Sequence, residues 1–493
     1  MKFRNRLNRQ LLLTAGITAA AGLNACKTER PNIVLILTDQ QFVNAMSITG
    51  NQNLHTPNMD RLAKSGVRFT HAYCSSPVSG PSRATIVTGM MPSEAGVNYN
   101  GDAIRDEIKT IGEIFREEGY YTIWGGKWHL PESYPQRANA RPEDKKIRGF
   151  DILPFWDATQ KRWMLGAETD PPLTEAVTGF LKTYDKSKPL FLAVSYHNPH
   201  DICFHPRKAG WVTENDSLLE IRYYGFKYRL PDPIGINPDQ IDNLPPLPDN
   251  FTPETDEPQF ITDKRLFHES YGVETKFAWE YTDKAWQSYL YSYYRMTELV
   301  DIEIGKLLDA LTEYGYDDNT LLIFTSDHGD GAAAHKWAAK LSLYEESTNV
   351  PFIIRYPPEI KGGEVDDKNL ISLADIVPTC CDYAGITTNI GFAGKSMRPV
   401  LENKSHKLRD NLIVELCDYK PDTTRTGRMV RTSGFKYNYY STGRNNEQLF
   451  DMIGDKGEMN NLAYDPEFKD QLEKHRKLLK DWNKSRSNNL QVK

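Results

Sequence analysis

The stretch Pro31-Asn32-Ile33-Val34-Leu35-Ile36-Leu37-Thr38 is a continuous apolar run between polar residues. This pattern is typical of a central parallel strand that is buried on both faces. Similar apolar segments recur along the chain at 121–124, 190–196, 320–325 and 351–355. Helical patterns alternate with them and cover residues 58–66, 111–118 and 285–314. Strands that alternate with helices predict an α/β fold, with a mostly parallel central sheet sandwiched by helices.

The chain is long enough for more than one structural unit. It has 493 residues, and single hydrophobic cores stop growing well below that size. We expect a large domain over residues 31–404, which contains a proline- and aromatic-rich insertion at about 204–284. A long insertion of this kind is either functional or a surface loop that packs its own aromatic side chains. Short strand patterns and a terminal helical pattern in residues 405–493 predict a smaller C-terminal α+β subdomain with a short antiparallel sheet.

The first residues have the pattern of an export signal rather than of a folded segment. Residues 1–25 combine a basic start with a short apolar run, which is too short for a stable membrane span. The sequence Leu23-Asn24-Ala25-Cys26 resembles a bacterial lipobox in which Cys26 is lipidated; an ordinary cleaved signal with an incidental cysteine is the alternative. We expect an exported bacterial lipoprotein of the periplasm or outer membrane, held at the membrane through its lipid anchor only. The net charge of −6 argues against a general nucleic-acid-binding role.

A second stretch, Pro77-Val78-Ser79-Gly80-Pro81-Ser82-Arg83-Ala84-Thr85-Ile86-Val87-Thr88-Gly89, predicts a short helix with an anion site at its start. Proline fits the first turn of a helix and glycine fits the position just past its end, so we expect a helix from about 80 to 88. Ser79 then lies at or beside the N-cap, where free backbone N–H groups favour an anion. Arg83 lies one turn further on and can reach back toward Ser79. The group suits an oxyanion of sulfate or phosphate size, and the plain alternative is a capping serine followed by a surface arginine.

Polar side chains follow two of the predicted strands at their carboxyl ends. Asp39 and Gln40 come directly after the first strand, and Asp327 and His328 follow the strand at 320–325. In a parallel sheet both pairs emerge at the same edge, so they can meet although they are far apart in sequence. Carboxylate and amide oxygens suit Ca²⁺ or Mg²⁺, whereas a lone histidine is too little for a zinc site. Together the two pairs indicate a divalent-metal site, while each pair alone could simply cap the following helix.

Basic residues recur just after the predicted strands. They are Lys127, His129, His197, His200, His335 and Lys340. Taken singly, a lysine is more often a solvated surface residue and a histidine a satisfied structural one. Taken together, they supply the positive charge that a bound dianion requires.

The order Ser79-Gly80-Pro81-Ser82-Arg83, closed by Thr88-Gly89, resembles the maturation signature of type I sulfatases, which is Cys/Ser-x-Pro-x-Arg followed by Thr-Gly. Further segments fall in the order and spacing of the same family. They are Asp39-Gln40, Gly126-Lys127-Trp128-His129, His197-Asn198-Pro199-His200, Ser326-Asp327-His328-Gly329, 340–347, Gln448-Leu449-Phe450-Asp451 and 458–462. The resemblance covers nearly the whole mature chain and implies an alkaline-phosphatase-like core.

The resemblance also implies roles for individual residues. Ser79 would be oxidised to Cα-formylglycine by a radical formylglycine-generating maturase, because serine is the variant of the motif that such anaerobic enzymes process. One Ca²⁺ would be bound by Asp39, Gln40, Asp327, His328 and the matured Ser79. Formylglycine and sulfate would be handled by Arg83, Lys127, His129, His197 and Lys340, with His129 assisting breakdown of the sulfated intermediate and His197 acting as the acid for the leaving alcohol. Gln40 and His328 depart from the family pattern, since many members have a second Asp and an Asn at these positions.

This interpretation predicts hydrolysis of sulfate esters on carbohydrates, with glycosaminoglycan or mucin-type sugars as the leading substrates. Aromatic and basic residues of the insertion could hold the saccharide, and they include Trp211, Arg222, Tyr224, Lys227 and Arg229. Two alternatives stay open. The first is a phosphodiester or phosphonate monoester hydrolase of the same superfamily, and the second is a non-catalytic glycan-binding lipoprotein whose Ser79 is not matured. We expect a sulfated saccharide as the binding partner and no nucleic acid.

Overall fold

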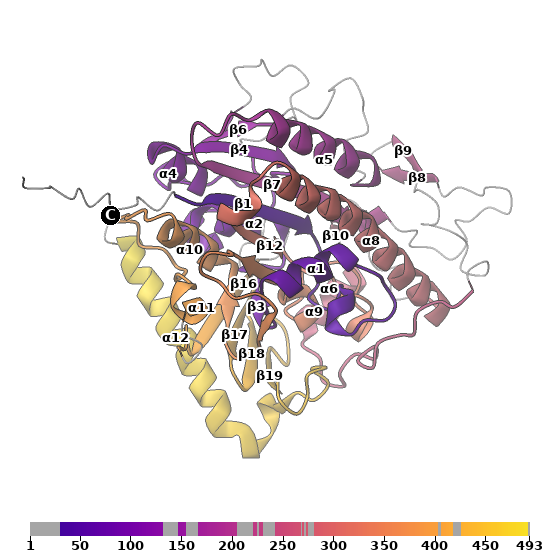
Figure 1. Cartoon of the computed structure of the whole chain (residues 1–493). Coiled ribbons are helices and arrows are strands. Elements are labelled where there is room, and N and C mark those ends of the chain that lie inside the picture. Colours follow the sequence, from indigo (N-terminus) through magenta and orange to yellow (C-terminus); the bar gives the residue numbers. More distant parts are fainter. Residues whose placement is uncertain are drawn as a thin grey trace, which may run out of the picture.

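A nine-stranded sheet forms the centre of the molecule in the part of the chain that the structure describes (Figure 1). The structure is a computed structural model, and it describes residues 30–131, 146–153, 166–204, 220–223, 226–229, 242–267, 269–270, 273–274, 281–402, 406–417 and 425–491. In spatial order the strands are β14 (Glu364–Asp366), β2 (Val67–Phe69), β13 (Phe352–Arg355), β12 (Thr320–Ser326), β1 (Asn32–Asp39), β7 (Leu190–Pro199), β4 (Tyr121–Gly126), β6 (Phe150–Ile152) and β5 (Lys146–Ile147).

Strand β1 lies in the middle of this sheet, as its apolar run predicts. It pairs in parallel with β12, from Asn32 opposite Thr320 to Thr38 opposite Ser326, and with β7 on its other side. Every residue of β1 after Asn32 is buried, because both faces of the sheet are covered. The predicted α/β fold with a mostly parallel sheet is confirmed, and its antiparallel pairings involve β13 and the edge strand β5.

Helices cover the two faces of the sheet because successive side chains of a strand point in opposite directions. Ile33, Leu35 and Leu37 of β1 share a hydrophobic core with α2, α4 and α10. Val34 and Ile36 share a second core with α1, α5 and α8, and Figure 1 shows α5 and α8 running alongside each other on that face. The bounds of these helices are α1 (Pro57–Ser65), α2 (Ser79–Thr88), α4 (Ile111–Glu117), α5 (Gly166–Thr183), α8 (Asp283–Glu313) and α10 (Ile376–Tyr383).

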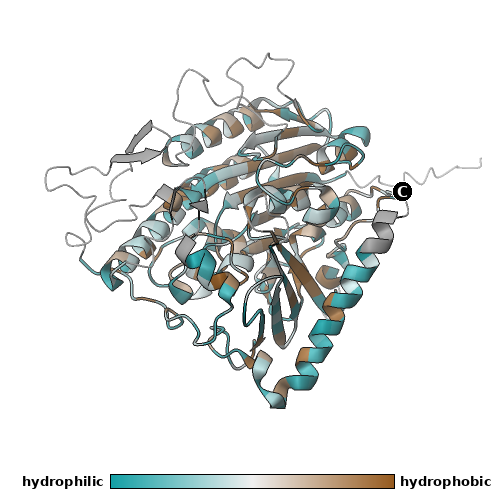
Figure 2. Cartoon of the chain, turned by 180° about the vertical axis from the view of Figure 1, so that it is seen from behind, coloured by the Kyte–Doolittle hydropathy of each residue, from teal (hydrophilic) through white to brown (hydrophobic). Residues whose placement is uncertain are grey.

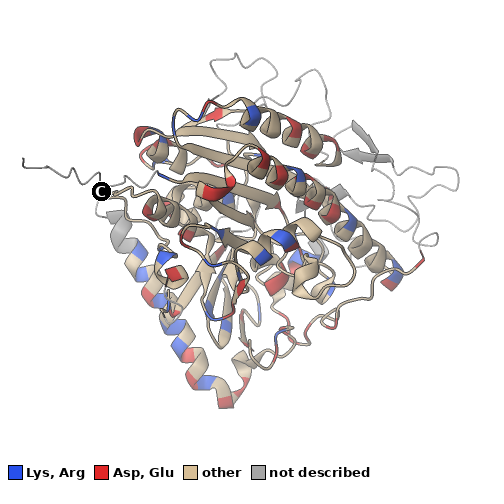
Figure 3. Ribbon diagram, viewed as in Figure 1, with Lys and Arg blue, Asp and Glu red and all other residues tan. Residues whose placement is uncertain are grey.

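The C-terminal subdomain is an antiparallel sheet with a helix on one face. Its strands pair in the order β16 (Asn411–Cys417), β17 (Thr426–Thr432), β18 (Phe435–Tyr440) and β19 (Glu447–Asp451). Helix α12 (Lys469–Gln491) packs on one face through Leu472 and Leu479. Figures 2 and 3 show apolar residues and charges of both signs along this helix. The other face of the sheet packs against Trp337 and Tyr344 of the large domain. The predicted α+β subdomain is confirmed.

Several sequence predictions fall outside the described residues. Residues 1–29 contain the predicted export signal and Cys26, and residues 403–405 contain the predicted domain boundary. Among the helices that the structure describes, none has the length and apolar character needed to cross a bilayer.

The predicted insertion at 204–284 is described in part. Residues 242–267 end in α6 (Gln259–Phe267), and two short hairpins join β8 (Glu220–Tyr223) to β9 (Phe226–Arg229) and β10 (Glu269–Ser270) to β11 (Val273–Glu274). The positions predicted to contact a saccharide are Trp211, Arg222, Tyr224, Lys227 and Arg229. Trp211 and Tyr224 lie outside the described residues, and for the other three the structure describes the backbone alone.

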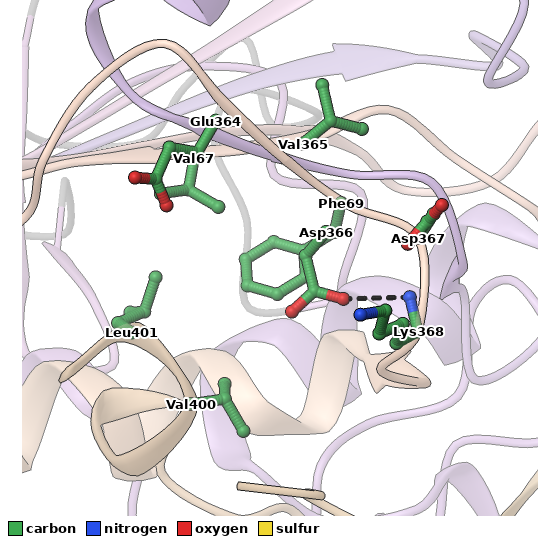
Figure 4. Close-up of a pocket in the computed structure, with 9 residues that line it drawn as sticks. All are labelled: Val67, Phe69, Glu364, Val365, Asp366, Asp367, Lys368, Val400 and Leu401. Carbon is green, nitrogen blue, oxygen red and sulfur yellow. Dashed lines mark hydrogen bonds between the residues drawn. The ribbon is translucent and has the colours of Figure 1, made fainter. Parts of the chain in front are cut away.

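One edge of the central sheet carries a pocket of about 120 Å³ (Figure 4). It is lined by Val67 and Phe69 of β2, by residues 364–368 and by Val400 and Leu401. The Asp366 carboxylate in this group accepts a hydrogen bond from the Lys368 backbone N–H. None of the lining residues is among those predicted for the functional site, which follow the more central strands of the sheet.

Candidate active site

The predicted site residues gather where the central strands end. Asp39 is the last residue of β1, and Asp327 and His328 directly follow β12. Lys127 directly follows β4. Because β1, β4, β7 and β12 run parallel, their carboxyl ends lie at one edge of the sheet. The sheet therefore brings together side chains that lie hundreds of residues apart.

Ser79 is the first residue of α2, and its side chain is fully buried. Val78 has an extended backbone and is the N-cap, so the helix begins one residue earlier than the sequence pattern predicts. Gly89 ends the helix with a φ of 69°, a left-handed conformation that glycine adopts without strain. Ser79 Oγ lies 2.9 Å from His328 Nε2 and accepts a hydrogen bond from Lys340 Nζ at 3.2 Å. Since every residue of α2 is buried, Ser79 is not an ordinary surface cap.

Arg83 ties the two carboxylates of the site together. Its guanidinium donates from Nε to Asp327 Oδ2 and from Nη2 to Asp39 Oδ2, both at 2.8 Å. Its Nη1 donates to the backbone carbonyl of Lys127 at 2.8 Å. The side chain is 1% exposed, so its charge is compensated inside the protein rather than by water. The sequence pattern predicted that Arg83 reaches back to Ser79, but its hydrogen bonds in the described residues organise the carboxylates instead.

Asp39, Asp327 and His328 form a candidate metal centre. One ligand atom from each of these buried residues lies within 4.8 Å of the other two. Asp39 Oδ1 is buried and accepts no hydrogen bond in the described part of the chain. His328 Nδ1 lies 2.8 Å from the Gly329 carbonyl, which makes Nδ1 the protonated nitrogen and leaves Nε2 available as a ligand. Burial lowers the pKa of His328 to about 4, so the imidazole is neutral. This donor set fits one divalent cation.

Gln40, another predicted metal ligand, has different partners for its side chain. Its backbone N–H donates to Asp327 Oδ1 at 3.1 Å, and its Nε2 donates to Asp330 Oδ2 at 2.7 Å. Its Oε1 accepts a weak hydrogen bond from Cys203 Sγ at 3.4 Å. Sequence reasoning missed Asp330, which also accepts a hydrogen bond from the Tyr289 hydroxyl at 2.8 Å. The sequence could have pointed to Asp330, because it lies only three residues after Asp327.

Basic side chains set the charge of the site. Lys127 Nζ lies 2.7 Å from Asp39 Oδ2. Burial by itself raises the pKa of Asp39, but the charges of Lys127 and Arg83 hold it well below its usual range. Burial lowers the pKa of Lys127, and burial together with the Lys127 charge holds the pKa of His129 well below its usual value. Asp39 is therefore ionised and His129 neutral, in a field that favours an added anion.

Two histidines of the His197-Asn198-Pro199-His200 segment have different surroundings. His200 Nε2 lies 4.0 Å from Asp39 Oδ1, whereas His197 Nδ1 lies 3.2 Å from Thr169 Oγ1. The sequence pattern ended this strand at residue 196, and the family resemblance implied the acid role for His197. In the structure β7 continues to Pro199, which pairs with Asp39 after a shift in register between Leu37 and Asp39. His200 is therefore the first residue past the strand end, and it is the histidine that faces the carboxylate.

The fold and the site together define a class of protein. A buried serine, two carboxylates around a cation position and neighbouring lysines are suited to hydrolysis of an ester with a tetrahedral oxyanion centre. The family model described as Sulfatase matches residues 31–386, and the model described as N-sulphoglucosamine sulphohydrolase, C-terminal, matches residues 333–485. The chain belongs to the sulfatase family and is a sulfuric ester hydrolase.

Known proteins resemble this chain along most of its length. A Delta 4,5-hexuronate-2-O-sulfatase of Bacteroides thetaiotaomicron is 31% identical over 474 aligned positions, which cover 94% of this chain and 91% of the relative. The solved structure of a 2-O GAG sulfatase has a TM-score of 0.75 and 29% identity, and the match covers 94% of each chain. A phosphonate monoester hydrolase of Agrobacterium radiobacter has a TM-score of 0.73 at 22% identity and covers 92% of this chain and 96% of that one. The last likeness shows a shared fold alone.

Proposed function

We propose that this sulfatase removes sulfate from saccharides of the glycosaminoglycan class, with a formylglycine derived from Ser79 as the nucleophile. The position of Ser79 carries the proposal. Its Oγ lies 2.9 Å from His328 Nε2 and 3.2 Å from Lys340 Nζ, beside the carboxylates that Arg83 holds. The saccharide class is supported by the hexuronate-2-O-sulfatase and the 2-O GAG sulfatase that resemble this chain.

Oxidation of Ser79 supplies a turnover step that a serine alcohol lacks. Attack of an unmodified serine Oγ on sulfur would leave a stable sulfate ester on the protein. A formylglycine hydrate carries a second hydroxyl on the same carbon, so loss of that hydroxyl's proton re-forms the aldehyde and expels sulfate. Because the encoded residue is serine, we infer that a radical formylglycine-generating maturase performs the oxidation.

The other side chains of the site hold the anion and move protons. Lys127 and Lys340 place positive charge beside the sulfate oxygens, where charge grows in the transition state. His200 is placed to protonate the leaving alcohol. Burial and the Lys127 charge hold the pKa of His200 well below its usual value, and the arriving sulfate ester raises it toward the protonated form. We assign to His129 the acceptance of the hydroxyl proton during release of sulfate.

We assign the cation to Ca²⁺, held by Asp39, Asp327, His328 and the oxidised Ser79, because carboxylate oxygens dominate the donor set. When bound, the ion lowers the pKa of the nucleophile's hydroxyl. Gln40 is the least well placed of the predicted ligands, since its side chain contacts Asp330 and Cys203.

We also infer that residues 1–25 direct export and that lipidated Cys26 anchors the protein to a bacterial membrane. Support comes from the basic start, the short apolar run and the Ala25-Cys26 junction. Cys26→Ala tests the anchor, because it should release active protein from the membrane fraction into the soluble exported fraction. Membrane retention of that variant would contradict the anchor.

The function is tested with protein co-expressed with its maturase. Mass analysis of the peptide that contains Ser79 should show loss of two hydrogens. The matured protein should desulfate one member of a panel of sulfated uronate and hexosamine saccharides, and hydrolyse an aryl sulfate faster than the matching aryl phosphonate. Faster phosphonate hydrolysis would favour the phosphonate monoester hydrolase alternative, and equal turnover by unmodified Ser79 protein would remove the formylglycine from the mechanism.

A further inference from the structure

A second group of buried ligating side chains lies away from Ser79. One ring nitrogen of His335 and one carboxylate oxygen each of Glu346 and Glu458 lie within 4.8 Å of one another. His335 belongs to the loop that carries Lys340, Glu346 to α9 (Glu345–Thr348), and Glu458 to the C-terminal subdomain. None of the three contributes to the active-site metal centre.

His335 is buried, and among the described residues its ring has few polar neighbours. The side chain is 0% exposed, and neither ring nitrogen makes a hydrogen bond of ordinary geometry, although the backbone of Gly457 lies near the ring. The ring stacks on Tyr344 with centroids 3.8 Å apart and planes 12° apart. Its backbone N–H donates to the Asn250 carbonyl at 2.7 Å. The imidazole is therefore held in a fixed orientation, and neither of its nitrogens makes an ordinary hydrogen bond within the described residues, which is costly for a buried polar group.

Glu346 and Glu458 each direct one carboxylate oxygen toward the group. Glu346 Oε1 accepts a hydrogen bond from Asn250 Nδ2 at 2.9 Å, while its Oε2 is buried and has no partner in the described residues. Glu458 Oε2 accepts a hydrogen bond from the Glu345 backbone N–H at 2.6 Å. Glu458 Oε1 lies 2.8 Å from Lys436 Nζ. The group thus offers one imidazole nitrogen and two carboxylate oxygens that are not fully satisfied.

Charge in this interior is unbalanced toward the negative side. Three carboxylates, those of Glu345, Glu346 and Glu458, face the cations Lys436 and Arg431 in the described residues. Arg265 also acts on His335, but its charge is paired with Glu257. Lys436 is shared between Glu345 and Glu458, at 3.2 and 2.8 Å. An uncompensated buried carboxylate is costly, so the group needs either a proton or a further cation.

We propose that His335, Glu346 and Glu458 form a second divalent-cation site, separate from the active-site metal centre. The donors are one imidazole nitrogen and two carboxylate oxygens, which are the same kinds of donor that Asp39, Asp327 and His328 offer at the active site. Burial lowers the pKa of His335 to about 3, so the imidazole is in the neutral form that ligates a metal. Burial raises the pKa of Glu458 to about 8, so a proton competes with the ion and binding strengthens as pH rises.

The ion would fix the loop that presents Lys340. Several residues of this loop have left-handed backbones, with φ between 45° and 75°; they are Ala332, Ala333, His335, Lys336, Ala339 and Leu341. Such conformations persist in residues other than glycine only when surrounding contacts hold them. A cation shared with Glu458 would add a cross-link between this loop and the C-terminal subdomain.

The test measures metal content with Zn²⁺ as the probe. Full-length protein is incubated with Zn²⁺ at pH 8, freed of unbound ion by gel filtration and analysed for metal per chain. Glu346→Gln should carry one zinc fewer than the wild type. Glu254→Gln is the matched control, since Glu254 is also buried, also has an unpartnered Oε2 and has a pKa raised to about 8 by burial; it should match the wild type. Because the readout is a difference between variants, it does not depend on sulfatase activity or on the active-site metal.

Equal zinc content in the wild type and Glu346→Gln would overturn the proposal and leave a shared proton as the balancing charge. If Glu346→Gln does not fold, crystals of the wild-type protein provide the test. Crystals soaked in Zn²⁺ at pH 8 should show an anomalous scattering peak between His335, Glu346 and Glu458 at the zinc absorption edge. A map without that peak would equally overturn the site.

Discussion

Lys340 Nζ donates a hydrogen bond to Ser79 Oγ across 3.2 Å, although 261 residues separate the two in the chain. Ser79 begins α2, while Lys340 lies in an irregular loop after β12. The contact places a positive charge at the atom that the maturation chemistry would change. The environment of the proposed nucleophile therefore depends on a loop whose shape is set by tertiary contacts.

Ser79→Ala should abolish turnover and leave the fold intact. Removal of a nucleophile lowers kcat by about 10⁴-fold or more, while loss of one hydroxyl from a small side chain leaves no large cavity. Steady-state rates on a sulfated saccharide and thermal unfolding check both statements. Ser75→Ala is the control, because Ser75 is equally buried and bonds only to Thr85 Oγ1 in the described side-chain contacts. Residual turnover above one part in about a thousand would contradict the nucleophile role.

Arg83→Lys should weaken both the fold and the metal centre. Lysine cannot span Asp39 and Asp327 with two parallel donors, and a broken buried ion pair costs about 3–5 kcal/mol. Denaturant unfolding measures the loss. Arg61→Lys provides the comparison, since the Arg61–Asp309 pair is 48% and 68% exposed and should change the unfolding free energy by less than about 1 kcal/mol. Similar losses for the two variants would mean that Arg83 has no special structural role.

His200→Asn should slow saccharide desulfation by about 10²–10⁴-fold and slow hydrolysis of 4-nitrophenyl sulfate far less, because an aryl leaving group departs without a proton. His197→Asn should not show this dependence on the leaving group. Ratios of kcat/KM for the two substrates compare the variants. A larger leaving-group effect in His197→Asn would restore the assignment that the family resemblance implied.

Chelation should remove activity reversibly without unfolding the protein. Asp39 also has Lys127 at 2.7 Å and Arg83 at 2.8 Å as charge partners, and we expect these two cations to compensate its charge after the metal ion is removed. Dialysis against EDTA should therefore give folded, inactive protein, and Ca²⁺ should restore activity at lower concentration than Mg²⁺. Full activity in protein shown by elemental analysis to contain no metal would contradict the assigned cation.

Glu254 should make the protein less stable as pH rises. Burial raises the pKa of Glu254 from 4.5 to about 8, so between these values the folded state holds a proton that the unfolded state has lost. The unfolding free energy of the wild type relative to Glu254→Gln should fall by about 1.4 kcal/mol for each pH unit in this window and level off above pH 8. Denaturant titrations at pH 5, 6, 7 and 8 follow the difference. A difference that stays constant with pH would show that Glu254 ionises normally.

Much of the fold follows from local sequence. The apolar run at 31–38 predicts β1 because eight neighbouring residues suffice to mark a strand buried on both faces. Pro81 and Gly89 bound α2 to within one residue, since each acts on the backbone of its own turn. The parallel arrangement also predicted that the residues after β1 and β12 meet, which is how Asp39 and Asp327 could be paired from sequence.

Only the tertiary structure decided which side chains of these segments touch. His200 rather than His197 faces Asp39, because β7 runs three residues beyond its apolar core and shifts the strand end. Arg83 donates hydrogen bonds to the two carboxylates of the site, and the Gln40 side chain donates one to Asp330. These outcomes depend on the register between strands that are distant in the chain and on loops with left-handed backbones. No periodic pattern encodes them, because periodicity reports which face a residue occupies and not which distant residue lies opposite.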